Sequence, residues 1–420
     1  MKKRLSALLL TVVMIASLAA CGTKTPPAAT GTDNAAVKDG TQGVTDTEIL
    51  IGNSAAVSGA YAPVGVPFIA GIQAYLDMVN SAGGIGGRKI TFIHYDDEFD
   101  PVKGKSYLQQ LVEDDKVFAI VGHFGTPVVS ATINDLKAYG IPSVYFATGI
   151  GQLYAEKATT NEEGYNIFPV QPIYTTEGQI MAARCISTLG GSKIGIIYTS
   201  DDAGKNMLEG ASKKCEELGI THVDAQVAAG AADVSAAVTT IKNAGVDCVI
   251  VAAIQATMPT IVKEMASQGM TAPAITTYVN VSPAISGQVA ADIAGKFDVY
   301  GDGWVSYEDF RADNLAKYQK WISADYANNA YAQTGWIAAA FFCEGLQRLA
   351  ANGQAVTWTN YMKAMEASPL QNPFGGSINY ANGLRAGTQE MNLSKINASQ
   401  PTGWELVDGL RSMSELASSK

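Results

Sequence analysis

The fold of this chain is decided by one stretch, Val117-Phe118-Ala119-Ile120-Val121-Gly122-His123-Phe124-Gly125-Thr126-Pro127. Its first five residues are continuously apolar, which is typical of a parallel strand that is buried on both faces. Gly122 and Gly125 allow the backbone to turn tightly where this strand ends. Thr126 is a good N-cap residue and Pro127 suits the first position of a helix, so a helix is expected to follow.

The start of that helix is a candidate binding site. The first backbone N–H groups of a helix have no partner within it, and here they follow the carboxyl end of a strand. Such groups are suited to bind a small anion, for example a carboxylate, above Gly125 and Thr126. An ordinary connection between a strand and a helix has the same sequence features, so this stretch alone leaves both interpretations open.

Strand and helix patterns alternate on both sides of this stretch. Before it, apolar strand patterns occupy residues 48–52 and 89–95, and the segment between them repeats apolar residues at helical spacing. After it, a strand over 141–146 ends in Ala147-Thr148-Gly149, and the alternation then starts again in a second series. The pattern predicts an α/β protein with two doubly wound lobes, each with its binding loops at the carboxyl ends of parallel strands.

Length and composition agree with two domains. The chain has 420 residues, of which 47% are hydrophobic and 16% charged, and it is too long for a single hydrophobic core. Its formal net charge is −10. This charge argues against a nucleic-acid partner, because phosphate binding needs a basic surface.

The first residues have the pattern of a targeting segment. Lys2-Lys3-Arg4 precedes an apolar segment that is too short to span a bilayer comfortably. That segment ends in Leu18-Ala19-Ala20-Cys21, which resembles a bacterial lipobox and implies a cleaved signal peptide (1–20) and lipidation of Cys21. The alternative is a plain secretory signal with a chance cysteine. Residues 21–45, rich in Thr, Ala, Pro and Gly, are expected to form a flexible linker.

No group of residues indicates catalysis, a cofactor or a metal. The carboxylates of Asp96-Asp97-Glu98 and Asp100 lack the ligand alternation of a calcium loop. Gly83-Gly84-Ile85-Gly86-Gly87 follows a helix and precedes a strand, which is the wrong context for a dinucleotide site. No nucleophile and base occur together, so the chain is predicted not to be an enzyme. Buried free thiols are favoured, and a disulfide stays open, for the cysteines outside the targeting segment: Cys185, Cys215, Cys248 and Cys343.

An ordered set of loop sequences resembles the type I solute-binding proteins of ABC transporters, the branched-chain amino-acid (leucine/isoleucine/valine) binding family. No single motif is specific, and the resemblance lies in the order of the motifs. The segments that carry it are Ser58-Gly59-Ala60-Tyr61, residues 80–88, Asp96-Asp97, residues 121–126, residues 146–149, Asp201-Asp202-Ala203-Gly204 and residues 247–253. The resemblance implies a periplasmic binding protein-like I fold with a three-crossover hinge. The N-terminal lobe is expected over 46–172 plus 282–373, and the C-terminal lobe over 173–281 plus 374–420.

In this family the ligand lies between the lobes. The resemblance implies that the loops with Gly125-Thr126 and Ala147-Thr148-Gly149 bind the head group of the ligand. Tyr61 and Phe124 would supply an apolar or stacking wall. From the opposite lobe, the expected ligand-binding residues are Asp202, Ala203, Gln255 and Tyr278.

Departures from the amino-acid binders bear on the ligand. Those proteins usually carry an aromatic residue at the position of Ala203, another near Ile254-Gln255, and a glutamate near Thr277-Tyr278 that neutralises the α-ammonium group. No acid lies in this last stretch, and an ammonium group buried without a partner costs several kcal/mol. Asp201 or Asp202 could replace the glutamate, so an amino acid and a different carboxylate or amide ligand both stay open.

The resemblance implies a lipid-anchored extracytoplasmic receptor that captures a small ligand and delivers it to an ABC permease and its ATPase subunits. A monomer is expected, at the cell surface in a Gram-positive bacterium or in the periplasm of a Gram-negative one. One alternative is a ligand-sensing receptor of the same fold that feeds a signalling partner. Another is a secreted α/β hydrolase, against which the missing nucleophile and base count.

Overall fold

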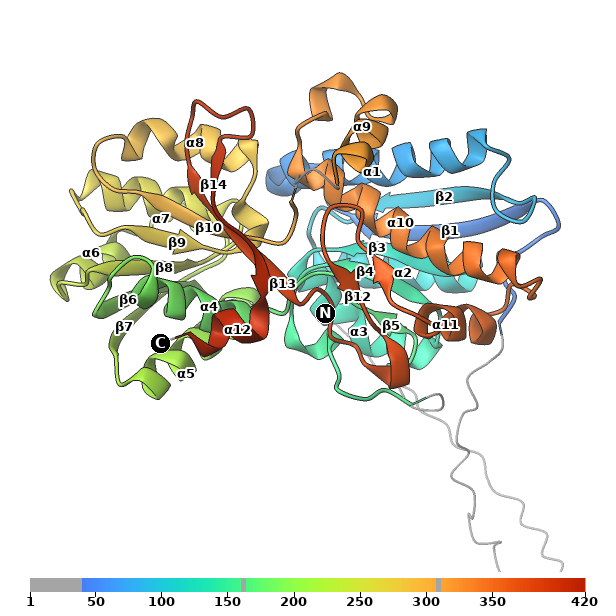
Figure 1. Cartoon of the computed structure of the whole chain (residues 1–420), viewed down its shortest axis with the longest axis horizontal. Helices are drawn as coiled ribbons and strands as arrows, with labels where there is room; N and C mark the ends of the chain where they lie inside the picture. The colour runs from blue at the N-terminus through green and yellow to red at the C-terminus, as the bar shows by residue number, and fades with distance from the viewer. Residues whose placement is uncertain (1–39, 160–163, 307–310, 420) are drawn as a thin grey trace, which may run out of the picture. The chain divides into compact units, whose positions relative to one another are not determined.

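The computed structural model describes residues 40–159, 164–306 and 311–419. The predicted signal peptide, Cys21 and most of the predicted linker over 21–45 therefore lie outside the described residues. The described chain is built on two large sheets whose strands alternate with helices, and it has one further two-stranded sheet (Figure 1). This arrangement confirms the prediction of an α/β protein with two parallel-sheet lobes.

The first sheet has five parallel strands in the order β2-β1-β3-β4-β5. Every residue of its central strand β3 is buried, as the continuous apolar run predicted. The strands are β1 (Glu48–Ala55), β2 (Lys89–Asp96), β3 (Ala119–Phe124), β4 (Ser143–Ala147) and β5 (Ile167–Phe168).

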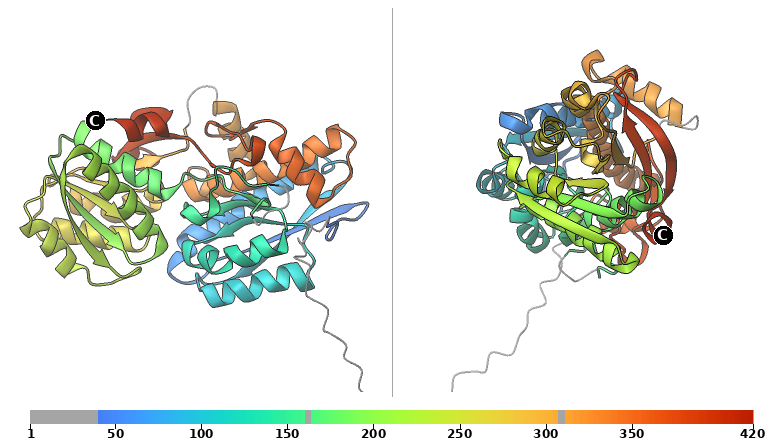
Figure 2. Two further views of the ribbon diagram at one scale, coloured as in Figure 1. Left: turned by 90° about the horizontal axis from the view of Figure 1, so that it is seen from below. Right: turned by 90° about the vertical axis from the view of Figure 1, so that its left-hand side faces the viewer.

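Helices from two distant parts of the sequence cover this first sheet. The orange α10 and α11 lie on one face, and the cyan to green α2 and α3 lie on the other (Figure 2). α1 packs along α10, and α9 packs on α1, so the C-terminal third of the chain completes the N-terminal lobe. The helices are α1 (Ala62–Ser81), α2 (Pro101–Gln109), α3 (Thr126–Tyr139), α9 (Ala312–Trp321), α10 (Ala330–Ala351) and α11 (Trp358–Glu366).

One of these helices is long and apolar enough to cross a membrane by length and composition. It is α1 together with the short turn before it, residues 59–81. Half of its most apolar window is buried inside the protein, where Phe68, Ile72 and Leu76 face the core and α1 contacts α10. Its apolar character is therefore explained by packing in the N-terminal lobe.

The second sheet has seven strands in the order β14-β13-β10-β9-β8-β6-β7. Its five parallel strands repeat the order of the first sheet, with the first strand of the series second from one edge. β13 and β14 add an antiparallel hairpin at the other edge. The strands are β6 (Lys193–Thr199), β7 (Thr221–Val227), β8 (Cys248–Ala252), β9 (Ala274–Thr276), β10 (Val299–Gly303), β13 (Glu390–Ile396) and β14 (Trp404–Ser412).

Helices also pack in pairs around this second sheet. α4 packs on α5, α12 on α4, and α7 on α8. The helices are α4 (Tyr174–Ser187), α5 (Asp202–Leu218), α6 (Ser235–Asn243), α7 (Thr257–Ser267), α8 (Pro283–Ile293) and α12 (Met413–Ser418). Cys185 of α4 and Cys248 of β8 are buried free thiols, and their Sγ atoms are in contact where the two elements pack.

Two crossings between the sheets differ from the expected boundaries. Residues 282–373 were expected in the first lobe, but β10 pairs with β9 and β13 of the second sheet, and α8 packs on α7. β10 reads Val-Tyr-Gly-Asp-Gly, and a strand with two glycines and an acid gives a weak sequence signal.

The last crossing also comes later than the expected position near Pro373. β11 (Leu370–Gln371) pairs with β12 (Ser377–Ile378) beside α10. Tyr380 Oη donates to the Pro169 carbonyl (2.6 Å), and Arg385 forms an ion pair with Glu366 (2.8 Å). These contacts hold residues up to about 388 on the first lobe, and the chain crosses just before β13.

Candidate functional site

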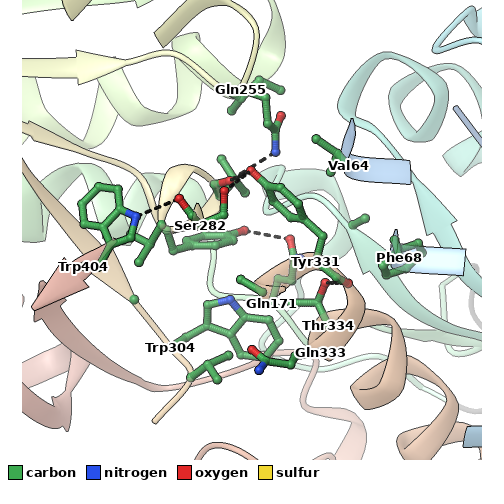
Figure 3. A pocket seen from close by; sticks show the side chains of 18 of the residues that line it. Val64, Phe68, Gln171, Gln255, Ser282, Trp304, Tyr331, Gln333, Thr334 and Trp404 are labelled. Atoms are coloured by element: carbon green, nitrogen blue, oxygen red, sulfur yellow. Dashed lines mark hydrogen bonds between the residues drawn. The ribbon is translucent and has the colours of Figure 1, made fainter. Parts of the chain in front are cut away.

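A cavity of about 400 Å³ lies between the carboxyl edges of the strands of the two lobes and the segments that cross between them (Figure 3). Its volume falls in the range of about 300–1,000 Å³ that is usual for sites of drug-sized ligands. Two parts of its lining differ in the elements that supply them. The strand-end wall is formed by Phe124, Gly125, Thr126 and Ala147, and the hinge wall by Trp304, Tyr331, Asn392 and Trp404.

The strand-end wall begins with the tight turn that the sequence predicted. Gly125 has φ of 89° and is the N-cap of α3, whereas Thr126 was expected at this position. A Cβ atom on Gly125 would lie 2.5 Å from Cε2 of Phe99, so the ring of Phe99 packs where a side chain would be. Only glycine combines this backbone conformation with such a close approach.

Thr126 is displaced from the N-cap because its hydroxyl has other partners. Its Oγ1 lies 2.8 Å from Oγ1 of Thr148, on the next strand-end loop. The hydroxyl of Tyr174 lies beside the side chains of both threonines, and burial raises the pKa of Tyr174 to about 12. The backbone N–H of Tyr174 donates to the Gly149 carbonyl (2.8 Å). We call Thr126, Thr148 and Tyr174 the hydroxyl cluster.

Tyr278 joins this cluster to the second lobe. Its ring stacks on Tyr174 with centroids 5.7 Å apart, and its hydroxyl donates to Oε1 of Gln171 and to the Pro172 carbonyl, both at 3.1 Å. Burial raises the pKa of Tyr278 well above its usual range, so the hydroxyl keeps its proton as a donor.

An acid does reach the stretch around Tyr278, but from another element. Glu177 of α4 is fully buried and accepts hydrogen bonds from the Tyr278 backbone N–H (2.7 Å) and from Thr277 Oγ1 (2.8 Å). Burial, followed by the nearby Asp302 carboxylate, raises the pKa of Glu177 well above its usual range. Glu177 is not among the residues that line the cavity, so it supports Tyr278 from behind.

The hinge wall is assembled from elements far apart in the sequence: Trp304 follows β10, Tyr331 lies at the start of α10, Asn392 lies in β13, and Trp404 is the first residue of β14. Trp404 Nε1 donates to the Ser282 carbonyl (2.9 Å). Ser282 Oγ donates to the Tyr331 hydroxyl (3.0 Å), which in turn donates to the Val279 carbonyl (3.1 Å). Figure 3 shows these side chains around the cavity, with Trp304 on the side of Gln333. Tyr331 therefore ties α10 of the first lobe to the start of α8 in the second.

The predicted ligand-binding residues fall into two groups. Six of them line the cavity: Phe124, Gly125, Thr126, Ala147, Gln255 and Tyr278. The others lie outside its lining. Tyr61 stacks on Phe99 at 3.6 Å between centroids, Thr148 and Gly149 lie behind the hydroxyl cluster, Asp202 accepts from Ser130 Oγ (2.7 Å), and Ala203 is buried in α5.

Asp202 and Ala203 lie where the two lobes meet beside the cavity. The bond from Ser130 of α3 to Asp202 of α5 crosses between the lobes. Asn206 Oδ1 of α5 accepts from the backbone N–H of Gly151 on the first lobe (2.9 Å). The loop that was expected to contact ligand thus contacts the opposite lobe.

Sequence reasoning missed the hinge wall and part of the aromatic lining. The missed residues that line the cavity include Phe68, Phe99, Tyr174, Trp304, Tyr331 and Trp404. Trp304 directly follows β10, so its position at a strand's carboxyl end was the one local signal. Trp404 and Tyr331 had none, because the place of Trp404 depends on the pairing of β14 with β13, and that of Tyr331 on the packing of α10 against α1.

Charged side chains are absent from the described lining of the cavity. Among the described lining residues, every side chain is apolar, aromatic, amide or hydroxyl-bearing, with no aspartate, glutamate, lysine, arginine or histidine. Within the described ranges, no cluster of His, Cys, Asp or Glu side chains has the geometry to hold a metal ion. The arrangement is therefore suited to binding and lacks an evident reactive group.

Comparison with known proteins agrees with the fold. A family model described as "Periplasmic binding protein" matches residues 48–401. The Leu/Ile/Val-binding protein homolog 2 of Brucella abortus is 24% identical over 333 residues, covering 79% of this chain and 85% of the relative.

Solved structures with other ligands in their titles share this fold. The fatty acid ABC transporter substrate-binding protein of Thermomonospora curvata has a TM-score of 0.75 at 22% identity, over 89% of this chain and 95% of that protein. A solute-binding protein of an R. palustris ABC transporter, in complex with benzoate, has a TM-score of 0.72 at 21% identity, over 87% and 96%. These structural matches support the same two-lobe α/β fold.

Proposed function

Because the chain belongs to the periplasmic binding protein family, we propose that it is an extracytoplasmic solute-binding receptor of an ABC transporter. It captures a small molecule in the cavity between its lobes and delivers it to a membrane permease with ATPase subunits. The observation that carries this proposal is the 400 Å³ cavity, whose lining comes from strand-end loops of both lobes and from the hinge.

Capture needs no chemical step. A ligand in the cavity contacts Thr126 and Ala147 on one lobe and Gln255 and Tyr278 on the other, so it stabilises the arrangement in which the lobes are close. Hinge motion of the lobes around the crossing segments would open and close the cavity. The permease would then recognise the arrangement with the lobes close, which is more populated when ligand is bound.

The ligand belongs to a broad class in this proposal. The Brucella relative is named for leucine, isoleucine and valine, and the two structural neighbours are titled for a fatty acid and for benzoate. An amino-acid-like molecule, a carboxylate and an amide all fit a cavity that combines aromatic rings with amide and hydroxyl groups.

Anchoring through Cys21 is part of the proposal. The basic Lys2-Lys3-Arg4, the apolar segment and the sequence Leu18-Ala19-Ala20-Cys21 support it. Lipid attached to Cys21 would hold the protein at the outer face of the cytoplasmic membrane. Expression of Cys21→Ala in a bacterial host tests this, since the variant should move from the membrane fraction to the soluble fraction, and an unchanged membrane fraction would contradict the anchor.

Ligand screening tests the receptor role. The purified protein is examined by thermal shift with a library of amino acids, carboxylates and amides. At least one solute, at a concentration of about 100 times its Kd, should raise the melting temperature by several degrees. Native mass spectrometry of the same sample should show one ligand per chain. A chain that turns over esters or amides and binds no solute would instead be a hydrolase, and the receptor role would be wrong.

A further inference from the structure

Aromatic rings form much of the cavity lining. Rings from both lobes and from the hinge face the same space, so a bound molecule meets ring surfaces on several sides (Figure 3). They come from Phe68, Phe124, Tyr278, Trp304, Tyr331 and Trp404. Aromatic walls of this kind favour flat, ring-bearing ligands, which they contact by stacking and edge-to-face packing.

The groups that would hold a charged amino group are engaged elsewhere. Both oxygens of Glu177 accept hydrogen bonds from the Thr277 hydroxyl and the Tyr278 backbone, behind the lining. Asp202 accepts from Ser130 across the lobes. The described lining residues offer an ammonium group only neutral oxygens, and burying it there without a counter-charge is costly.

The expected cradle for an amino-acid head group is also filled by the protein's own bonds. Thr126 and Thr148 hydrogen-bond to each other, and the hydroxyl of Tyr174 lies beside both. The other polar side chains of the lining are hydroxyls and carboxamides, among them Asn392, whose Oδ1 has no hydrogen-bond partner in the described part of the chain. Carboxamides donate and accept hydrogen bonds without carrying charge, and they match neutral polar groups on a ligand.

We propose that the ligand is a ring-bearing molecule that carries no ammonium group, seated between the strand-end wall and the two tryptophans of the hinge wall. This inference rests on the proposed receptor function and narrows its ligand class. It sets the chain apart from a binder of free α-amino acids, because the described lining carries no acidic side chain that could pair with the ammonium group.

A matched set of probes tests the inference. Phenylalanine, 3-phenylpropanoate and 3-phenylpropanamide share one carbon skeleton, and only the first carries an ammonium group. Isothermal titration of the full chain should give at least tenfold tighter binding for one of the two compounds without the ammonium group. A wider set extends the test to other ring sizes, with benzoate, benzamide, indole-3-acetate and indole-3-acetamide beside the twenty amino acids.

Each outcome decides the inference. Binding of phenylalanine or any other amino acid within tenfold of the tightest ring-bearing acid or amide overturns it, and leaves the receptor function in place. If only solutes without a ring bind, the inference is also overturned and the receptor function stays in place. Failure of every probe and of the solute library overturns the inference and the receptor function together.

The two tryptophans provide an independent readout. A ring seated beside Trp304 and Trp404 should change the tryptophan fluorescence on titration, and Trp404→Phe with Trp304→Phe should abolish most of that change while the protein stays folded. Trp304→Ala should weaken the tightest ring-bearing probe at least tenfold. Trp321→Phe, on α9 outside the lining, is the matched control and should leave both the signal change and the affinity as in the wild type. Equal loss in the control, or no loss in the Trp304 and Trp404 variants, would contradict seating at the hinge wall.

Discussion

The strand-end wall and the hinge wall close the same cavity but are built in different ways. The strand-end wall follows β3 and β4 directly, and its shape comes from a tight turn at Gly125 and from neighbouring hydroxyls. The hinge wall gathers residues far apart in the sequence, for example through the bond from Trp404 to Ser282, which are 122 residues apart.

Buried charge distinguishes the hinge side further. Beneath Trp304, the fully buried Asp302 forms an ion pair with Arg184 of α4, and the same guanidinium donates to the Asn392 carbonyl (2.7 Å). These bonds join β10, α4 and β13. Local backbone geometry therefore shapes one wall, whereas a buried polar network positions the other.

The largest expected effect comes from breaking that network. Asp302→Ala leaves the Arg184 guanidinium buried without its counter-charge, so the free energy of unfolding should fall by about 3–5 kcal/mol. Urea unfolding at pH 7.5 measures this loss.

A matched control uses an exposed ion pair. Lys105 and Asp135 lie 3.0 Å apart at the surface, and Asp135→Ala should cost less than about 1 kcal/mol. The double variant Arg184→Met with Asp302→Leu removes both charges and should recover most of the stability. Similar losses for Asp302→Ala and Asp135→Ala would show that the hinge wall does not depend on its buried charge.

The strand-end wall is tested at its turn. Gly125→Ala forces a left-handed backbone on alanine and places Cβ against the Phe99 ring, so a loss of about 2–3 kcal/mol is expected in thermal or urea unfolding. Gly190→Ala also has positive φ but meets nothing within 4 Å, and should cost only about 1 kcal/mol. Adding Phe99→Ala to Gly125→Ala should lower the additional cost, and strict additivity of the two changes would argue against the contact.

The contribution of the loop that carries Phe99 to the free energy of unfolding should depend on pH. Burial raises the pKa of Asp97 to about 6, while the unfolded carboxyl titrates near 3.9, so between these values the folded state holds a proton that the unfolded state has lost. The stabilising contribution of Asp97 is complete below about pH 4 and is lost as the pH rises through 6.

Comparison with Asp97→Asn isolates this effect. The free energy of unfolding of the wild type, minus that of the variant, should fall by about 2 kcal/mol between pH 4 and pH 7. Parallel pH profiles of the two proteins would mean that Asp97 does not bind this proton in the folded state.

The smallest effect is expected within the hydroxyl cluster. Thr126→Val keeps the shape of the side chain but removes its bond to Thr148, and should lower the free energy of unfolding by about 1 kcal/mol. The exposed Thr239, bonded to Gln268, gives the control Thr239→Val, which should lie within about 0.5 kcal/mol of the wild type. A loss of ligand affinity in Thr126→Val without loss of stability would instead place its hydroxyl on the ligand.

Much of the fold could be predicted from local patterns. The continuous apolar run before Gly122 predicted the buried β3, and the alternation of strands and helices predicted two parallel sheets. The local turn pattern suggested Gly125 and Thr126, and the other four predicted residues that line the cavity came from the family resemblance. The N-cap at Thr126 was wrong by one residue, because a tertiary bond to Thr148 outweighed the threonine's capping preference.

The boundaries between lobes could not be predicted in the same way. β10 carries two glycines and an acid, so its pattern gives little sign of a strand, and it joins the second sheet through its pairing with β9 and β13. The acid that approaches Tyr278 was absent from its local sequence, because Glu177 reaches it from α4, about a hundred residues earlier.

By itself, the sequence determined the fold class, the two series of strands and the loops at their carboxyl edges, since these depend on hydrophobic periodicity and on turn residues close together in the chain. Only the tertiary structure decided which residues form the hinge wall and which partners hold the acidic side chains outside the cavity lining. Their positions depend on pairing between segments one to two hundred residues apart, and local patterns carry no information about which distant segments meet.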